Sequence, residues 1–264
     1  MSLSYSLKKS YQKLIFNLSA TENPLYLGFY KYFYSPPKNS LAAFLDKFSR
    51  KRSGIKFIQI GANDGFIHDP LHKFIKRDNW SGVMLEPQPD VYEQYLLKLY
   101  QSRDEVITIN AALDKKDGKA TLYKIGPSKD RWATGLASFD RKVLHRNLLK
   151  EKTKRKARKQ GLEIPENPEK WIEAVKIDTI STDTLLKKGK TRNPDILAID
   201  TEGFDFEILK MFDLSKVNPD VIIYEEENFD QVTKESCKNY LTEHEYVYHQ
   251  VGRDAYAVKK GLKI

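Results

Sequence analysis

The amino-acid sequence predicts an α/β protein built on one mostly parallel sheet that ends in an antiparallel hairpin. Short apolar runs rich in β-branched residues alternate with segments of helical periodicity, which indicates parallel strands joined by right-handed helical crossovers. Polar residues follow most of these runs directly. The last two runs, 246–248 and 255–258, are separated by too few residues for a parallel crossover, so the final strands must be antiparallel.

Residues 1–53 predict a basic helical arm that precedes the sheet. Leu7, Tyr11 and Leu14 recur at helical spacing among lysines, and the apolar residues between 41 and 48 do the same. The region holds nine Lys and Arg against two acids, a net charge of +7. We expect a helical cover packed on the main domain. The alternative is an arm that binds a partner or touches a membrane surface, since lysines beside Tyr and Phe suit an anionic interface.

The main domain, residues 54–264, opens with the apolar run Phe57–Ile60, which predicts a buried strand. The run stops at the turn Gly61-Ala62-Asn63-Asp64-Gly65. Glycine at such a turn lets the backbone approach a ligand closely and adopt positive φ. A turn of this kind is also typical of a simple tight connection, so its role depends on what the later strand ends carry.

The next two predicted strands also end in polar groups. The run 82–85 leads to Glu86, and the run 106–109 leads to Asn110 and Ala111. In an open α/β sheet, ligands bind outside the carboxyl ends of the strands. These residues suit a nucleoside, because a carboxylate can accept hydrogen bonds from both ribose hydroxyls while an amide or backbone group contacts the base.

A long insertion at about 126–173 interrupts the alternation of strands and helices. The run 120–125 before it predicts an added hairpin strand, and the run 174–177 after it predicts the next strand of the main sheet. Residues 141–161 hold ten Lys and Arg against one acid, a net charge of +9, which leaves −7 outside the two basic segments. A solvated helix face explains such a run. Its place between core strands also suits a lid over the ligand edge.

Acidic residues follow the next two strands of the predicted sheet. Asp200 and Glu202 lie at and just after the end of the run 195–199. Glu225, Glu226 and Asn228 follow the run 221–224. Since parallel strands deliver their carboxyl ends to one edge, these side chains are expected near the glycine turn.

Together these segments resemble the FkbM family of S-adenosylmethionine-dependent methyltransferases. The resemblance covers about residues 54–260 and is carried by the terminal hairpin and by Ile58-Gln59-Ile60-Gly61-Ala62-Asn63-Asp64-Gly65, Leu85-Glu86-Pro87 and Leu197-Ala198-Ile199-Asp200-Thr201-Glu202-Gly203. It implies a Rossmann-like seven-stranded methyltransferase sheet, mostly parallel with a reversed strand in the C-terminal hairpin, and helices on both faces. It also implies O-methylation, frequently of sugar hydroxyls.

The cofactor that the resemblance implies is S-adenosyl-L-methionine. By analogy it would be bound by Gly61, Asn63, Gly65 and Glu86. The sequence adds Asp64, whose negative charge would attract the cationic cofactor, and Asn110 with Ala111, placed to contact the adenine.

A nicotinamide dinucleotide is the competing cofactor. The turn has no third glycine at the Rossmann spacing, and Asp64 faces the helix start where a pyrophosphate would bind. Two anions there would repel each other. We therefore rank an NAD-dependent dehydrogenase below a methyltransferase.

Methyl transfer to a hydroxyl requires in-line alignment and removal of the hydroxyl proton. Glu202 is the preferred base, with Asp200 beside it. His68 and His145 are alternative bases on nearby loops. The alternative for the two acids is a structural role at the start of the following helix.

A metal ion is a further hypothesis for this edge. Asp200, Glu225, Glu226 and Asn228 offer hard oxygen ligands suited to Mg²⁺, which would polarise neighbouring sugar hydroxyls. The alternative is that the run of glutamates forms an exposed loop.

The basic segments raise a second class of function, an RNA-directed methyltransferase or a basic nucleic-acid-binding protein. Stacking aromatics are absent from the run 150–159, and the rest of the domain is acidic, so nucleic acid is not the expected partner. The expected acceptor is a sugar or glycan, anionic or linked to a membrane. The sequence also has a single cysteine, Cys237, and no long apolar span or signal peptide, which predicts a cytoplasmic protein. Peripheral membrane contact through the arm is the alternative to a helical cover.

Overall fold

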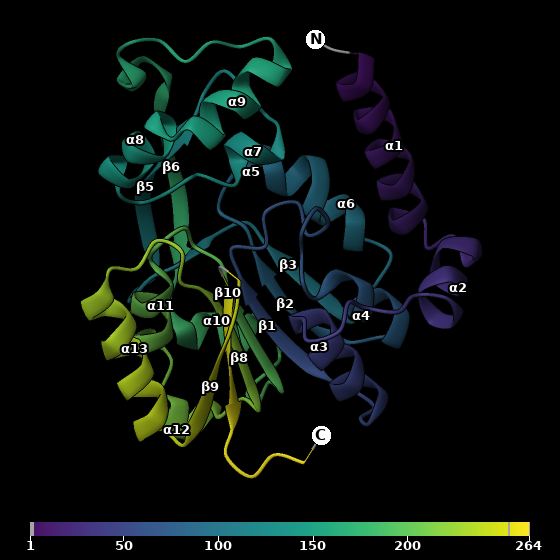
Figure 1. Cartoon of the computed structure of the whole chain (residues 1–264). Coiled ribbons are helices and arrows are strands. Elements are labelled where there is room, and N and C mark those ends of the chain that lie inside the picture. The colour runs from purple at the N-terminus through teal and green to yellow at the C-terminus, as the bar shows by residue number, and fades with distance from the viewer. Residues whose placement is uncertain (1–2, 253, 264) are drawn as a thin grey trace.

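The computed structural model describes residues 3–252 and 254–263. Its central sheet contains β1 (Lys56–Ile60), β2 (Ser81–Leu85), β3 (Val106–Ile109), β7 (Ile196–Ile199), β8 (Val221–Glu225), β9 (Tyr246–Val251) and β10 (Asp254–Lys259). The strand order is β3-β2-β1-β7-β8-β10-β9 (Figure 1). Only β10 runs against its neighbours β8 and β9, while the other neighbouring pairs are parallel. The expected seven-stranded sheet with a reversed strand in its C-terminal hairpin is confirmed.

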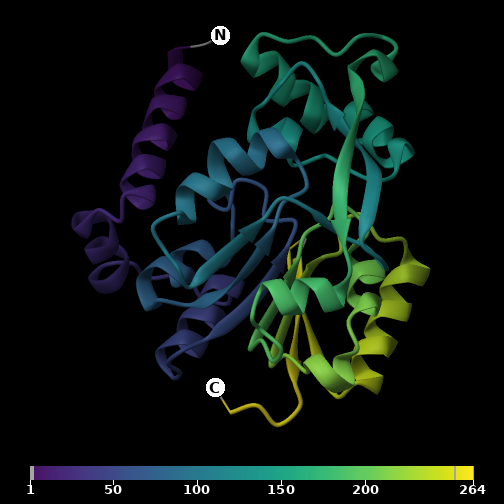
Figure 2. The same ribbon diagram turned by 180° about the vertical axis from the view of Figure 1, so that it is seen from behind.

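Helices cover both faces of this sheet (Figures 1 and 2). One face packs against α3 (Leu41–Arg50), α4 (His72–Asp78) and a continuous helix made of α5 (Pro89–Val91), the π-turn η1 (Tyr92–Leu96) and α6 (Leu97–Tyr100). The other face packs against α10 (Thr182–Lys188), α11 (Asp205–Met211), α12 (Leu214–Val217) and α13 (Gln231–Glu243). All four residues of β7 are buried, as expected for a parallel strand that is covered on both sides.

A second, three-stranded sheet lies beside the central one. It consists of β4 (Ala112–Leu113), β5 (Gly118–Ile125) and β6 (Ile172–Ile180), in the order β4-β6-β5. The expectation that the run 174–177 continues the main sheet is wrong, because β6 pairs with β5 and β4 instead. The physical reason lies in its pattern: Glu173, Lys176 and Asp178 are not buried, and a strand carrying them cannot enter a sheet covered on both faces. The run 120–125 pairs antiparallel with β6, across the insertion.

The insertion between β5 and β6 has a small core of its own. It contains α7 (Arg131–Thr134), α8 (Arg141–Leu149), α9 (Glu151–Gln160) and the 3₁₀ turn η2 (Pro168–Trp171). Buried apolar side chains from the helices and the two strands form that core: Ile125, Ala133, Leu144, Leu148 and Ile172. In Figure 1 this unit stands above the carboxyl ends of the central strands.

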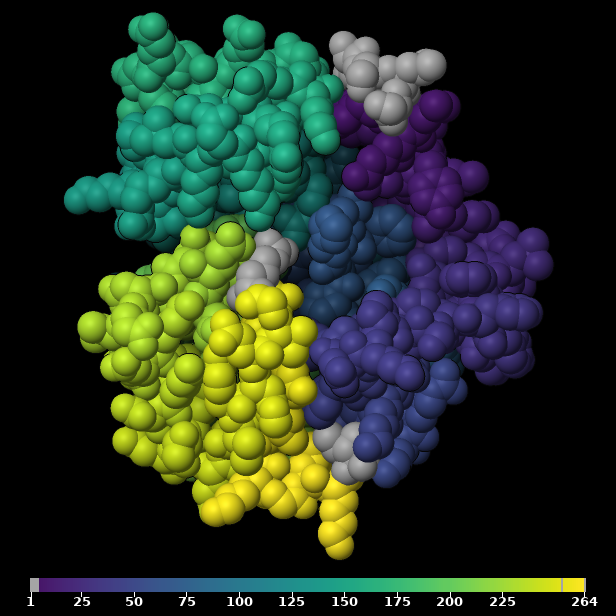
Figure 3. Space-filling view, viewed as in Figure 1, coloured from purple at the N-terminus to yellow at the C-terminus, as the bar shows by residue number. Residues whose placement is uncertain are grey.

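The helices α1 (Leu3–Ala20) and α2 (Pro24–Tyr32) form one edge of the molecule (Figures 1 and 3). Phe16 of α1 packs edge-on against Phe66 and Tyr95. In contrast, α3 belongs to the core of the main domain, where Leu45 and Phe48 are buried with residues of β1 and α4. Within the described residues, no helix is both long and apolar enough to span a bilayer.

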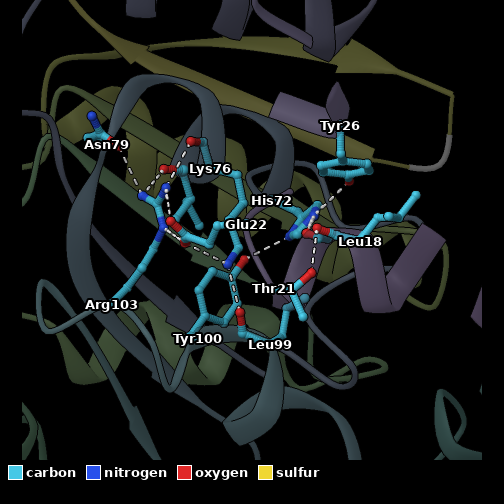
Figure 4. A network of polar contacts seen from close by, with 12 residues as sticks. Leu18, Thr21, Glu22, Tyr26, His72, Lys76, Asn79, Leu99, Tyr100 and Arg103 are labelled. Carbon is cyan, nitrogen blue, oxygen red and sulfur yellow. Dashed lines mark hydrogen bonds and ion pairs between the residues drawn. The ribbon is translucent and has the colours of Figure 1, made fainter. Parts of the chain in front are cut away.

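A buried polar network holds α1 and α2 against the domain (Figure 4). Glu22 forms ion pairs with Lys76 and Arg103, and the Lys76 side chain is only 1% exposed. Beside this group, His72 lies 3.0 Å from Ser19 Oγ and 3.2 Å from the Tyr26 hydroxyl. Burial lowers the pKa of His72 to about 3 and the pKa of Lys76 to about 8.

Candidate active site

A cleft lies at the carboxyl ends of β1, β2 and β7 and has a volume of about 590 Å³, counting the part open to solvent. The strand ends of the central sheet and the loops that follow them supply Ile60, Gly61, Asn63, Leu85, Glu86, Pro87, Gln88, Ala111, Asp200, Thr201 and Glu202, and β4 supplies Ala112 and Leu113. Ile208, Leu122 and residues of the insertion, Arg131, Thr134, Gly135, Ala137, Ser138 and Phe139, complete the lining.

Gly61 allows three strand ends to meet at the bottom of this cleft. Its φ is +79°, and a Cβ at this position would collide with the backbone carbonyl oxygen of Asp200. The backbone amides of Gly61 and Ala62 donate to the carbonyl of Leu85 at 3.0 and 2.8 Å. A residue with a side chain would therefore force β1 and β7 apart.

Glu86 is the buried carboxylate of the cleft. Its Oε2 accepts a hydrogen bond from the backbone amide of Asn63 at 2.8 Å. Its Oε1 accepts from the backbone amide and the side-chain amide of Gln88 at 2.9 and 3.1 Å. Burial raises the pKa of Glu86 to about 7, against the opposing effect of these donors and of Arg131. Each carboxylate oxygen has two lone pairs; Oε1 already accepts two hydrogen bonds and Oε2 one, so Oε2 can still accept a hydrogen bond from a ligand hydroxyl.

The other predicted cofactor residues divide into two groups. Asn63 and Ala111 line the cleft with Gly61 and Glu86, whereas Asp64, Gly65 and Asn110 lie outside its lining. Asp64 is buried and accepts from the amides of Phe66 and Ile67, both at 2.9 Å, and burial raises its pKa.

Gly65 and Asn110 support the cleft from behind. A Cβ on Gly65 would lie 2.6 Å from Leu96 Cδ1, so this glycine lets the turn pack closely on the helix that begins at α5. Asn110 donates through Nδ2 to the carbonyl of Glu86 at 2.8 Å and so joins the ends of β2 and β3.

The insertion forms one wall of the cleft. The Thr134 hydroxyl donates to Asn63 Oδ1 at 3.2 Å, and Gln88 Nε2 donates to the Thr134 carbonyl at 2.9 Å. These contacts join α7 to the glycine turn and to the loop after β2. Ligand specificity can therefore depend on the insertion as well as on the sheet.

Arg131 is a site residue that the sequence analysis missed. Among the described lining residues it alone carries a positive charge. Its buried Nε has no hydrogen-bond partner among the described residues, and the nearest acid, Asp64, has its Oδ1 3.9 Å away. Nothing in the local sequence marks this arginine, because only the folding of the insertion brings α7 to the sheet edge.

Three carboxylates gather at the carboxyl ends of β7 and β8. Asp200, Glu202 and Glu225 each place one carboxylate oxygen within 4.8 Å of the others. Asn228 donates through Nδ2 to Glu202 Oε2 at 3.4 Å. Glu226 lies outside this group and accepts from the Tyr248 hydroxyl at 2.9 Å. Of the four residues predicted to bind a metal, the cluster thus contains Asp200 and Glu225, together with the predicted base Glu202.

Asp205, which the sequence analysis also missed, braces this acidic cluster from behind. It is fully buried and accepts from the backbone amide and hydroxyl of Thr201 at 3.1 and 2.9 Å. Its other oxygen accepts from the amide of Glu225 at 3.1 Å. It therefore joins the ends of β7 and β8. Burial, followed by repulsion from Asp200, raises the pKa of Asp205 to about 7.

The two predicted histidine bases lie outside the described lining of the cleft. His68 is exposed, with φ at +62°, on the loop after the glycine turn. His145 lies on α8, with its Nε2 3.9 Å from a carboxylate oxygen of Glu169. Asp200 and Glu202 are therefore the candidate bases at the cleft itself.

The strand order, the reversed strand next to the edge and a cleft with a buried carboxylate after the second strand define a Rossmann-like methyltransferase fold. The chain belongs to the FkbM methyltransferase family, because the model of the methyltransferase FkbM domain matches residues 59–248. Membership of this family supports the conclusion that the protein transfers a methyl group from S-adenosylmethionine.

Similar solved structures include an FkbM methyltransferase from Methylobacillus flagellatus KT, with 15% identity and a TM-score of 0.45. That match covers 97% of this chain and 56% of the other, so this chain spans little more than half of that protein's length. A precorrin-6y C5,15-methyltransferase from Geobacter metallireducens GS-15 has 14% identity and a TM-score of 0.41, over 86% of this chain and 95% of the other.

A third similar structure is the methyltransferase PaMTH1 from Podospora anserina, bound to S-adenosylhomocysteine. It has 9% identity and a TM-score of 0.39, over 98% of this chain and 97% of the other. No curated protein matches the sequence.

Proposed function

We propose that this protein is an O-methyltransferase that transfers the methyl group of S-adenosylmethionine to a hydroxyl of a sugar or glycan. One observation carries the proposal: Asp200 and Glu202 line the same cleft as Glu86 and the glycine turn. A group that can remove a hydroxyl proton thus faces a site suited to a nucleoside. The choice of a sugar hydroxyl follows the resemblance seen in the sequence, which implies O-methylation of this kind.

The residues of the cleft fit the cofactor. Glu86 Oε2 has a remaining lone pair for a ribose hydroxyl, and the backbone at Ala111 can contact the adenine. Arg131 offers a buried donor without a partner among the described residues, which suits the carboxylate of the methionine part. The cofactor supplies an electrophilic methyl group. The chain's part is to align the acceptor and to receive its proton.

Glu202 is the proposed base. Its carboxylate lines the cleft, and the Asn228 side chain contacts one of its oxygens. Asp205 sets the position of the neighbouring strand ends through Thr201 and Glu225. In this arrangement Glu202 accepts the hydroxyl proton while Asp200 orients the acceptor through a hydrogen bond.

A metal-assisted version of the reaction is proposed as the alternative role of the same acids. The close oxygens of Asp200, Glu202 and Glu225 match the ligand preference of Mg²⁺. A bound cation would lower the pKa of a sugar hydroxyl and fix its position. Turnover measured with exhaustively chelated protein, with and without added Mg²⁺, separates the two versions: activity that chelation leaves unchanged excludes the metal.

The basic helix α9 supports an anionic acceptor. Lys152 Nζ lies 4.0 Å from Glu227 Oε1, so α9 reaches the loop that follows β8, whose Asn228 contacts Glu202 of the acidic cluster. Exposed cations on this helix can attract a phosphorylated or acidic glycan. An RNA acceptor is the second candidate that this helix favours.

The experiment uses S-adenosylmethionine labelled in its methyl group with neutral, acidic and lipid-linked glycans and with RNA. We expect label on a sugar oxygen, located by nuclear magnetic resonance of the product. Glu202→Gln should lower kcat by roughly a hundredfold or more, as expected for loss of a general base, with cofactor binding retained. Glu207→Gln on the exposed face of α11 is the matched control. Label that appears only on RNA or on nitrogen refutes the proposal.

A further inference from the structure

The exposed surface of α1 and α2 carries an unusual share of large apolar side chains. On α1 the exposed residues Leu7, Tyr11 and Leu14 follow helical spacing and share one face. On α2 and directly after it, the exposed residues are Leu25, Phe29, Tyr32 and Phe33. Leu25 is 85% exposed and Phe33 is 77% exposed, so neither contributes much to the core.

The apolar face of α1 is distinct from the face that packs on the domain. Phe16, which contacts Phe66 and Tyr95, is nine residues after Leu7. Nine residues are two and a half helical turns, so these two side chains point in opposite directions. The helix thus uses one apolar face for folding, and its second apolar face is turned to solvent.

Helix α2 has the same division. Tyr26 is buried against His72, whereas Leu25 and Phe29, on another side of the helix, are exposed. The ion pairs of Glu22 with Lys76 and Arg103 fix both helices to the domain (Figure 4). The exposed apolar side chains are therefore held in a fixed position relative to the domain. Figure 3 shows the atoms of α1 and α2, in purple, along one edge of the molecule.

Positive charge surrounds the apolar stripe. Lys8 and Lys13 are exposed and flank the Leu7–Leu14 stripe of α1 on either side. Lys31 and Lys38 are exposed at and after the end of α2. Aromatic and aliphatic side chains bordered by lysines complement a surface that is apolar within and anionic outside, which is the profile of an acidic lipid bilayer.

We propose that α1 and α2 dock in the headgroup region of an anionic lipid bilayer. The apolar side chains enter the boundary between headgroups and acyl chains, and the lysines contact lipid phosphates. Tyr11 and Tyr32 suit this depth because their rings are apolar and their hydroxyls are polar.

Docking would also bring the cleft close to the bilayer. Asp130, the N-cap of α7, receives a hydrogen bond from Tyr5 and an ion pair from Lys9, both on α1. The next residue, Arg131, lines the cleft. This proximity suits a membrane-linked acceptor. The inference about the acceptor rests on the proposed function, whereas the proposal that the arm binds lipid does not.

The test is flotation of the full chain with vesicles of phosphatidylcholine alone or of phosphatidylcholine and phosphatidylglycerol at about three to one. We expect binding to the anionic vesicles that weakens by roughly tenfold or more when salt rises from about 0.05 to 0.5 M. No binding to the anionic vesicles, or equal binding to both kinds, overturns the proposal.

Two double variants test whether the exposed surface of α1 and α2 is the one that binds the vesicles. Leu25→Ser/Phe33→Ser removes exposed apolar groups, and Lys8→Gln/Lys13→Gln removes charge; each should lower vesicle binding by roughly tenfold. The matched controls, Val232→Ser on α13 and Lys216→Gln on α12, should bind as the wild type does. An unchanged thermal melting temperature shows that the variants fold. The result of this lipid-binding test does not depend on whether the protein methylates a sugar.

Three other outcomes refute the proposal. The first is full vesicle binding by both arm variants. The second is binding that is lost on Lys152→Gln/Lys154→Gln in α9 and retained in the arm variants. The third is a wild-type dimer in solution that ignores vesicles and dissociates on Leu25→Ser/Phe33→Ser, which makes the surface a contact between protein copies.

Discussion

Gly61 and Asp200 are in such close backbone contact that the strands β1 and β7 can approach only because Gly61 lacks a Cβ. The contact places the end of β7, and with it the acidic cluster, beside the glycine turn. The geometry of the cleft thus depends on the absence of one methyl group.

Gly61→Ala should therefore destabilise the protein by about 3 kcal/mol or more, since the new Cβ meets rigid backbone at a positive φ. Gly54→Ala is the matched control: φ is +68° there as well, and no described atom lies within 4 Å of the added Cβ. It should cost only about 1 kcal/mol. Urea denaturation measures both, and equal losses would contradict the steric argument.

Cofactor binding should depend on pH through Glu86. Its pKa of about 7 means that the carboxyl is largely protonated at pH 6, whereas ribose hydroxyls require acceptors. The dissociation constant of S-adenosylmethionine should rise by up to about tenfold per pH unit below 7. Calorimetry between about pH 6 and 8 checks this, and Glu86→Gln should bind weakly with little pH dependence.

The stability of the protein without ligand should depend on the protonation of Glu86 in the opposite direction. A carboxyl whose pKa is raised in the folded state binds its proton more tightly there, so its contribution is fully present below about 4.5 and is lost as pH rises through 7. The free energy of unfolding of the wild type, relative to that of Glu86→Gln, should therefore decrease as pH rises from about 4.5 through 7. A flat difference would show that Glu86 is not buried as a carboxylate.

Arg131 should contribute to affinity through the amino-acid part of the cofactor. Arg131→Met retains apolar bulk and removes the charge, so the dissociation constant of S-adenosylmethionine should rise about tenfold or more. Binding of 5′-methylthioadenosine, which lacks the carboxylate, should not change. Lys129→Met, a more exposed neighbour, is the control. Equal weakening of both ligands would mean that Arg131 only supports the wall of the cleft.

The arm should be fixed by the ion pairs of Glu22. Glu22→Gln leaves Lys76 and Arg103 without their carboxylate partner, and the expected loss of stability is about 2 kcal/mol after allowance for partial exposure of Glu22. The arginine and lysine lower the pKa of Glu22, so this contribution is present above about 4.5 and is lost as pH falls below it. Chemical denaturation at neutral and acidic pH measures it. Glu207→Gln, from an exposed pair with Lys210, should cost less than about 0.5 kcal/mol.

The central sheet was predictable because its strands are continuous apolar runs, and the reversed strand followed from the short connection around Gly252. The place of Gly61, Asn63 and Glu86 in the cleft was predictable because strand ends mark the ligand edge. The position of β6 was not, since a short apolar run does not identify its partner strand. Arg131 and Asp205 escaped prediction for a related reason: their roles come from contacts between separate segments.

The small core of the insertion, which includes Leu144 and Leu148, is separate from the two cores that cover the central sheet. Its helices join the domain through β5 and β6, and α7 supplies a wall of the cleft. Substitutions in this unit can thus reshape the ligand surface while the sheet keeps its packing. Acceptor choice and folding stability can therefore diverge independently among related sequences, with the insertion as the variable module and the sheet as the constant one.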